Sequence, residues 1–184
     1  MSLTPTLFKR HHGDHCIYDC PDPIAQWVIK GEGVATRKWD GVPVLISGRA
    51  VYKRIFLPVR ARRPRGFVPI SERNGWIPVS RMDRAYHEAL DRLLSTSTFD
   101  DIQGTWELCG PDILGNPERL ADHTMFRHGE ALLPRAPRTY GALDDYLQSV
   151  DIEGIVWHHP DGRRAKLKGK DFPGGGRRGA LWQQ

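Results

Sequence analysis

The chain has 184 residues, 39% of them apolar, which is enough for one domain with a core of ordinary size. It contains no run of eighteen apolar residues and no apolar N-terminal leader, so we expect no membrane span and a soluble, cytoplasmic protein. Three cysteines exclude a disulfide framework, and a formal charge of +5 favours a polyanionic partner such as nucleic acid or nucleotide phosphates over a membrane.

Prolines and glycines suggest how the chain is divided. Residues 1–23 are polar and contain three prolines that break any helix, so we expect an irregular N-terminal arm that packs on the domain. Residues 24–172 are expected to form the single domain. Residues 173–184 are rich in glycine and arginine and are expected to form a flexible basic tail.

Alternating apolar residues predict the strands of this domain, and helical spacing predicts its helices. In chain order we expect a hairpin of residues 42–46 and 51–57 around Ser47-Gly48, a basic loop over 60–66, a short strand within 67–79, a helix over 80–94, a strand over 103–109, a helix over 139–150, and a hairpin of 153–159 and 164–168. Ser80 and Asp83 predict a capping box for the first helix, and Met82 belongs to its apolar positions. Strands joined mainly by hairpins indicate an antiparallel α+β domain.

Lysines carry the first candidate chemistry. Lys38 lies in the segment Lys38-Trp39-Asp40-Gly41, between two expected strands, from which its side chain can project into a cleft. A lysine amine attacks an electrophile only when neutral, so burial or neighbouring positive charge must lower its pKa. Lys166 and Lys168 are two positions apart on an expected strand, which places both ammonium groups on one face, where they could hold phosphate oxygens.

Carboxylates complete the candidate set. Glu107 lies inside an expected strand, and Glu153 opens the last hairpin. An acidic side chain can accept the hydroxyls of a ribose or, together with Asp40, hold a magnesium ion and its waters. Nucleotidyl transfer needs a nucleophile, cations for the triphosphate, carboxylates for the metal and a sugar contact, and this chain offers all four.

The order of these residues resembles a known superfamily. Lys-x-Asp-Gly at 38–41, the strand glutamate Glu107, Glu-Gly-Ile-Val at 153–156 and Lys-x-Lys at 166–168 are similar to nucleotidyltransferase motifs I, III, IV and V of DNA ligases, RNA ligases and mRNA capping enzymes. Residues 106–129 resemble small RNA ligases. The resemblance implies an adenylation domain of antiparallel sheets flanked by helices around an ATP cleft. Because the chain ends soon after the last motif, we expect no OB-fold domain.

The resemblance also implies a role for each matching residue. Lys38 would be the catalytic residue that carries AMP, and ATP with Mg²⁺ or Mn²⁺ would be the cofactors. The other implied contacts are metal binding by Asp40 and Glu153, nucleotide binding by Asp40 and Gly41, nucleotide or 5′-phosphate binding by Arg54, ribose binding by Glu107, adenine stacking by Phe126, and phosphate binding by Lys166 and Lys168.

The function that this resemblance implies is ATP-dependent ligation of RNA 5′-phosphate and 3′-hydroxyl ends through lysyl-AMP, as in RNA repair. Acceptance of DNA and the oligomeric state are left open by the sequence. One alternative is a stand-alone adenylyltransferase that activates a 5′-phosphate without efficient sealing. Another is a non-catalytic nucleic-acid-binding module.

Two further clusters each allow two interpretations. The side chains His11, His12, His15, Cys16 and Cys20 are types that bind zinc, but their spacing matches no common zinc finger, and ordinary surface residues are the alternative. The basic loop is either an RNA-backbone contact or a solvated loop. We expect Trp106 and Trp157 to lie in the core or in a cleft wall rather than to stack on bases.

Overall fold

We describe residues 4–175 of a computed structural model, in which the chain forms two compact units. The central unit is Asp40–His128, and the terminal unit comprises the described parts of Leu3–Trp39 and Gly129–Gln184. Contacts therefore group the residues differently from the expected arm at 1–23 and single domain at 24–172. Of the expected tail, residues 176–184 lie outside the described residues.

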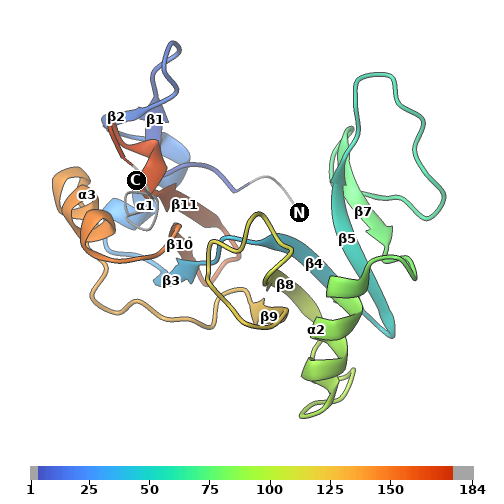
Figure 1. The fold of residues 1–184 in the computed structure, drawn as a ribbon. Coiled ribbons are helices and arrows are strands. Elements are labelled where there is room, and N and C mark those ends of the chain that lie inside the picture. The colour runs from blue at the N-terminus through green and yellow to red at the C-terminus, as the bar shows by residue number, and fades with distance from the viewer. Residues whose placement is uncertain (1–3, 176–184) are drawn as a thin grey trace. The chain divides into compact units, whose positions relative to one another are not determined.

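The central unit is built on one antiparallel sheet and one longer helix (Figure 1). Its elements are β4 (Val42–Ser47), β5 (Ala50–Phe56), β6 (Val68–Pro69), β7 (Asn74–Pro78), α2 (Arg84–Leu94), β8 (Gly104–Cys109) and β9 (Thr124–Arg127). The six strands are ordered β6-β7-β5-β4-β8-β9. The apolar face of α2 packs on one side of the sheet, in a core of Val44, Ile46, Ala89, Ile102, Trp106, Leu108, Ile113 and Met125.

Two local expectations in the central unit were wrong. Ser47 pairs with Ala50, so the two turn residues of the first hairpin are Gly48 and Arg49 rather than Ser47 and Gly48. Gly48 has φ +59°, a conformation that glycine adopts without a steric penalty. The helix predicted over 80–94 begins only at Arg84, and Met82 is 87% exposed instead of buried.

The terminal unit contains a three-stranded antiparallel sheet, a two-stranded hairpin and four helical segments. Its elements are β1 (Phe8–Arg10), β2 (Ile17–Pro21), the 3-10 turn η1 (Pro23–Ala25), α1 (Gln26–Ile29), β3 (Val34–Lys38), α3 (Tyr140–Ser149), β10 (Gly154–His158), β11 (Arg164–Lys168) and η2 (Gly169–Asp171). The sheet order is β11-β10-β3, and β1 pairs with β2. The predicted second helix and last hairpin are confirmed, as is the antiparallel α+β class.

The N-terminal segment is part of this unit's core rather than an irregular arm. Leu7, Phe8 and Ile17 are fully buried, next to Trp157 and Leu143. Its backbone also continues the sheet: the Leu7 N–H donates to the carbonyl of Lys166 at 2.8 Å, and the Lys166 N–H donates to the carbonyl of Pro5 at 2.9 Å. The prolines at 5 and 21 do not prevent short strands that bury the apolar residues between them, and Pro23 opens the 3-10 turn η1.

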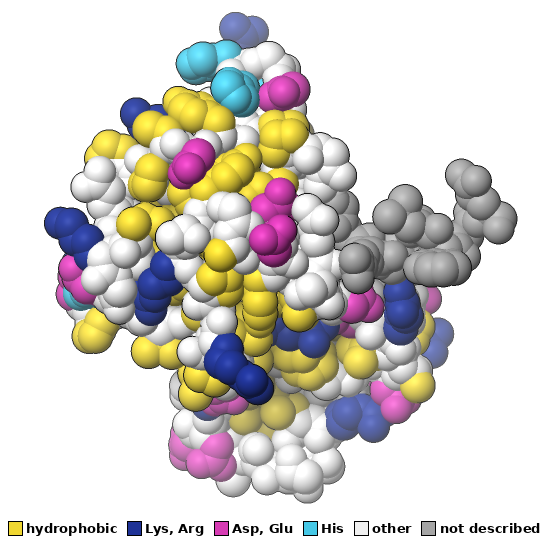
Figure 2. Space-filling view, turned by 90° about the vertical axis from the view of Figure 1, so that its left-hand side faces the viewer, with side chains coloured by type: hydrophobic (Ala, Val, Ile, Leu, Met, Phe, Trp, Pro, Cys, Tyr) yellow, Lys and Arg dark blue, Asp and Glu magenta, His cyan; other side chains and the backbone are white. Residues whose placement is uncertain are grey.

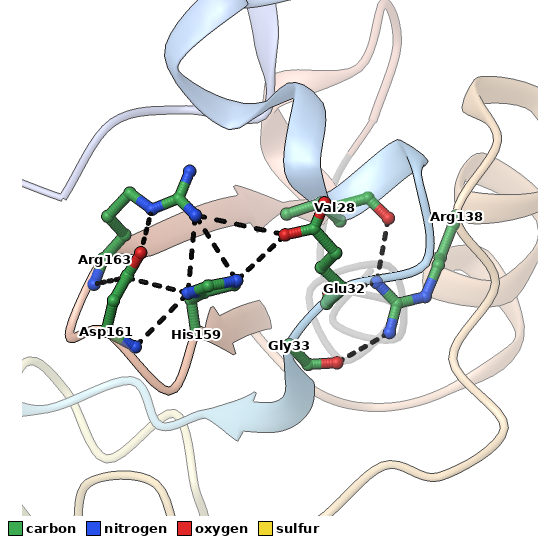
Figure 3. Close-up of polar contacts among 7 residues, drawn as sticks. All are labelled: Val28, Glu32, Gly33, Arg138, His159, Asp161 and Arg163. Atoms are coloured by element: carbon green, nitrogen blue, oxygen red, sulfur yellow. Dashed lines mark hydrogen bonds and ion pairs between the residues drawn. The ribbon is translucent and has the colours of Figure 1, made fainter.

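Polar contacts fasten the end of the three-stranded sheet that lies farthest from Lys38 (Figure 3). Arg138 donates to the carbonyls of Val28, Glu32 and Gly33 at 2.8, 2.6 and 2.8 Å, which fixes the chain just before β3. His159, in the turn between β10 and β11, lies 2.9 Å from Glu32. The start of β3 and the end of β10 are thereby held together, and a one-residue slip of the pairing would break these contacts.

The turn between β1 and β2 carries the histidine cluster. His11, His12 and His15 are exposed, and histidine side chains gather at one tip of the terminal unit (Figure 2). Within residues 4–175 no group of three or more His, Cys, Asp or Glu side chains is arranged to hold a metal ion. No helix in the same part of the chain is long and apolar enough to cross a membrane.

Gly154 allows the close pairing of β10 and β11 beside Glu153. A Cβ atom at this position would lie well inside van der Waals contact with the carbonyl oxygen of Leu167 and 2.8 Å from the Cα of Lys168. Both are backbone atoms, so the strands themselves would have to move. Close packing of the two strands thus requires glycine at this position of the Glu-Gly-Ile-Val motif, which the sequence alone did not reveal.

Gly154→Ala should therefore lower the free energy of unfolding by about 1–3 kcal/mol, the usual cost of forcing an extra methyl group into a packed site. The matched control is Gly141→Ala in α3, where nothing lies within 4 Å of the added methyl group, and the variant should gain about 0.5–1 kcal/mol from helix propensity. Urea denaturation measures both changes. Equal stabilities for the two variants would contradict the packing argument.

Asp83 joins the start of α2 to the sheet. Its carboxylate accepts from the N–H and hydroxyl of Ser80, both at 2.7 Å, and forms an ion pair with Lys53 of β5 at 2.6 Å. Half of the predicted capping box is thus formed, because the carboxylate of Asp83 accepts from the Ser80 N–H. The other half is missing, because the Asp83 N–H donates to the carbonyl of Ser80 at 3.1 Å rather than to its hydroxyl, and the pair closes a turn before the helix. Burial raises the pKa of Asp83, but the hydrogen bonds from Lys53 and Ser80 outweigh it, so the net pKa lies below its ordinary value of 3.8.

Because the folded-state pKa of Asp83 is depressed, its stabilising effect is fully present above about pH 3.8 and is lost as the pH falls through the folded-state pKa. Asp83→Asn should lower the free energy of unfolding by about 1–3 kcal/mol at pH 7, as expected for a lost charged hydrogen bond. The difference from wild type should become smaller as the pH falls below 3.8. Urea denaturation from pH 7 to pH 3 measures this difference. A difference independent of pH would show that the aspartate charge is not what stabilises the turn.

Candidate functional site

Strand register places the candidate lysines on one face of the three-stranded sheet. Gly154 of β10 is paired on one side with Lys38 of β3 and on the other with Lys168 of β11. Lys166 lies two residues before Lys168 and therefore on the same face. The opposite face holds Ile155, Trp157, Ala165, Leu167 and Ala35, all buried in the core. The alternation of β11 thus gives one apolar face and one lysine face, as its sequence predicted.

Glu153 is the centre of this lysine cluster. One of its carboxylate oxygens forms a short ion pair with Nζ of Lys38, and the other forms a short ion pair with Nζ of Lys168. The Glu153 side chain is only 8% exposed, while those of Lys38 and Lys168 are 19% and 22% exposed. The Gly169 N–H donates to the Glu153 carbonyl at 3.0 Å, which fixes the backbone as well. A buried carboxylate therefore bridges two lysines that approach it from neighbouring strands.

The crowding of these charges affects the pKa values of the cluster. Burial raises the pKa of Glu153, but the charges of Lys38 and Lys168 and their hydrogen bonds outweigh it, so the net pKa is lowered. Burial lowers the pKa of Lys166, and the positive charges of Lys168 and Lys38 lower it further. Glu153 and Asp171 act in the opposite direction on Lys166, but its net pKa is still lowered, so the three ammonium groups outnumber the carboxylates near them and the cluster is electrostatically suited to receive another anion.

A second carboxylate, Asp171, contacts the backbone of Lys168 and was not predicted from the sequence. It accepts from the backbone N–H of Lys168 at 3.1 Å and forms an ion pair with Arg10 of β1 at 2.8 Å. Its side chain is 5% exposed. The contact to Lys168 is local, but the partner Arg10 comes from the N-terminal hairpin, so only tertiary structure reveals it.

In the central unit, register gathers a second group of candidate residues. Glu107 is paired with Phe126 in β9 and with Pro43 in β4, so the three share one face of the six-stranded sheet. Alternation along β4 and β5 places Arg54 on this same face, opposite to the one that α2 covers. The structure therefore brings Arg54, Glu107 and Phe126 to one face.

Glu107 has a histidine partner that the sequence analysis missed. His128 Nε2 lies 2.8 Å from the carboxylate of Glu107, and the Glu107 side chain is 8% exposed while that of His128 is 29% exposed. His128 comes two residues after Phe126, so the period of the strand could have indicated that it continues the same face. A buried carboxylate held by an imidazole is suited to accept hydrogen bonds from hydroxyl groups.

Asp40 and Gly41, the last two residues of the Lys-x-Asp-Gly segment, are the first residues of the central unit. A Cβ atom on Gly41 would collide with the carbonyl oxygen of Leu108 and lie 2.7 Å from Sγ of Cys109, so this glycine lets the chain pack against β8. The backbone N–H of Asp40 donates to the carboxylate of Glu118 at 2.9 Å. Gly41 thus has a clear packing role in the Lys-x-Asp-Gly segment.

The candidate residues consequently form two groups. Lys38, Glu153, Lys166 and Lys168 lie together in the terminal unit, whereas Arg54, Glu107 and Phe126 share a sheet face in the central unit. Glu153 offers a single carboxylate as a metal ligand. Magnesium is usually bound by one or two carboxylates together with waters and substrate phosphates, and not by a cage of protein ligands. A single carboxylate is therefore a donor set that fits magnesium.

Comparisons of the chain with protein-family models and with curated proteins give no match.

Proposed function

We propose that this chain is an ATP-dependent RNA ligase that joins 5′-phosphate and 3′-hydroxyl ends through a covalent lysyl-AMP intermediate on Lys38. The observation that carries the proposal is the lysine cluster around buried Glu153, in which Lys38 and Lys168 both contact one carboxylate. Two further supports are the order of the four motifs along the chain and the sheet face shared by Arg54, Glu107 and Phe126.

In the first step, neutral Nζ of Lys38 attacks the α-phosphorus of ATP. A nitrogen–phosphorus bond forms, the bond from the α-phosphorus to the bridging oxygen breaks, and pyrophosphate leaves with the electron pair, while the amine loses its proton. Because the structure holds this amine in an ion pair with Glu153, it must first leave the carboxylate and give one proton to water, which makes it neutral. It gives a second proton to water as the nitrogen–phosphorus bond forms.

Lys166 and Lys168 would stabilise the charge that develops on the departing pyrophosphate. Both lie on the face that carries Lys38, and the pKa of Lys166 is lowered first by burial and then by the positive charges of its two lysine neighbours. One well-placed donor of this kind is commonly worth about 10²–10³ in rate. Incoming phosphate oxygens would relieve the crowding of the ammonium groups.

Two transfers complete the ligation. An oxygen of the 5′-phosphate of an RNA end attacks the phosphorus of lysyl-AMP. The phosphorus–nitrogen bond breaks, the lysine nitrogen takes up a proton from water as it leaves, and AMP remains joined to the RNA through a pyrophosphate bond. The 3′-hydroxyl of a second end then attacks the 5′-phosphorus, loses its proton and expels AMP. In both transfers the protein mainly positions the groups in line and neutralises their charge.

The remaining residues keep the roles that the resemblance implies. Metal binding is assigned to Glu153 and to Asp40, and magnesium or manganese would supply positive charge to the triphosphate. For Glu107 the proposed contact is the ribose, and its buried carboxylate paired with His128 is chemically suited to accept hydroxyl groups. Arg54 is assigned to the nucleotide or 5′-phosphate, and Phe126 to adenine.

Replacement of Lys38 tests the covalent step. After incubation with magnesium and ATP labelled in the α-phosphate, the wild-type chain should retain label in a denaturing gel, and Lys38→Ala should retain none. Lys38→Arg should retain none either, because arginine keeps a cation beside Glu153 but its guanidinium does not lose a proton in proteins. Exposed Lys30 provides the matched control, and Lys30→Ala should label like wild type.

Label on Lys38→Arg would contradict the proposed nucleophile. Addition of 5′-phosphorylated RNA to the labelled wild-type protein then tests ligation. Joined strands support a ligase, whereas AMP-capped RNA that is never joined would show an adenylyltransferase that activates the end without sealing it.

Glu153→Gln tests the positioning of the cluster. The amide keeps the size of the side chain but loses the charge that holds Lys38 and Lys168, so the rate of lysyl-AMP formation should fall about 10²-fold, as is common for a misplaced reacting group. Asp145→Asn, at an exposed position of α3, is the matched change of a carboxylate to an amide and should leave the rate unaltered. A wild-type rate in Glu153→Gln would remove Glu153 from the site.

A further inference from the structure

One segment of the central unit carries a net charge as large as that of the whole chain. Residues 54–73, which we call the arginine arm, contain six arginines and a single acidic residue, Glu72. The whole chain has 27 basic and 22 acidic side chains, so the residues outside the arm contain 21 of each and are balanced. The arm alone thus has a formal charge of +5, equal to that of the whole chain.

The charges of the arginine arm face solvent. Arg60, Arg62, Arg63 and Arg65 are exposed, in the loop that follows β5 (Figure 1). Among residues 4–175, no carboxylate forms an ion pair with any of the six arginines. A solvent-exposed concentration of arginine without acidic partners attracts polyanions from solution.

Aromatic rings alternate with these charges. The guanidinium carbon of Arg73 lies 4.3 Å from the centroid of the Phe56 ring, and that of Arg63 lies 5.5 Å from the centroid of Phe67. Phe56 is nevertheless 60% exposed, and its apolar neighbour Val59 is 68% exposed. A large apolar ring left open to solvent next to arginines is suited to stack on a planar, negatively charged partner.

The arm is continuous with the sheet face that carries Glu107. Arg54 is paired with Trp76 of β7, and its guanidinium carbon lies 5.9 Å from the centroid of that ring. Phe56 is two residues after Arg54 in β5 and therefore belongs to the same face. Basic and aromatic groups thus extend from the candidate nucleotide-binding residues of the central unit into the exposed loop.

We propose that the arginine arm binds a single-stranded polynucleotide, with arginines on the phosphates and Phe56 stacked on a base. The inference deepens the proposed function and rests on it only for the identity of the strand as RNA. Arginine presents a planar fork that fits phosphate and also stacks on rings, and all six basic side chains of the arm are arginine. Exposed bases are available to Phe56 in single strands but not in a stacked duplex.

Binding of oligouridine tests this inference without any ligation chemistry. The probe is fluorescent oligouridine with a 5′-hydroxyl, measured by anisotropy in the absence of ATP at several salt concentrations. The variant carries glutamine in place of Arg60, Arg62, Arg63 and Arg65. The charge-matched control carries glutamine in place of Lys30, Arg49, Arg81 and Arg135, all exposed and outside the arm.

The arm variant should bind at least tenfold more weakly than wild type. If each arginine contacts one phosphate, its plot of log affinity against log salt should be shallower by about 3, since one contact on a single strand contributes about 0.7. The control should change affinity less than threefold. Phe56→Ala should weaken binding by roughly tenfold with an unchanged salt slope, because stacking releases no counterions.

Several results would overturn the inference. These are wild-type affinity in the arm variant, an equal loss in the control, a changed salt slope in Phe56→Ala, or tighter binding of duplex RNA than of oligouridine. Binding of the arm to vesicles that contain phosphatidylserine, without binding to oligouridine, would instead assign it to a membrane surface. A chain that binds oligouridine through the arm but never acquires AMP would retain this inference and lose the proposed function.

Discussion

The site of the terminal unit depends on the burial of one carboxylate between two lysines. A lone charge of this kind is expensive to remove from water, and loss of one partner of a buried ion pair commonly costs about 3–5 kcal/mol. Glu153 avoids this cost because Lys38 and Lys168 contact its two oxygens from neighbouring strands. Each lysine is in turn positioned by the carboxylate. The arrangement gathers charge where an anionic substrate could exchange partners with it.

Backbone geometry makes this convergence possible. Lys38, Gly154 and Lys168 are directly paired across three strands, and Gly154 lets β10 and β11 approach where any Cβ atom would collide with backbone. At the far end of the sheet, Arg138 binds three carbonyls before β3, and so helps to hold the register that places Lys38 opposite Gly154. Residues far from the lysines thus determine which side chains surround Glu153.

Local periodicity explains what the sequence could predict. The two-residue spacing of Lys166 and Lys168 was enough to place them on one face, and apolar spacing was enough to predict the helix that the structure shows as α3, in which Leu143 and Leu147 are buried. Partners distant in sequence could not be deduced from periodicity. The ion pair of Arg10 with Asp171, for example, depends on an N-terminal hairpin whose strands are too short to show alternation. Met82 was misassigned because Asp83 closes a turn before α2, which removes residue 82 from the helix.

Location of AMP on the chain tests the central claim most directly. The protein would be incubated with ATP and magnesium and digested with a protease, and the modified peptide would be sequenced by tandem mass spectrometry. Our account predicts AMP on Lys38 in a phosphoramidate bond that is cleaved by acid. AMP on Lys166, on Lys168 or on any other residue, or a chain that acquires no AMP, would contradict it.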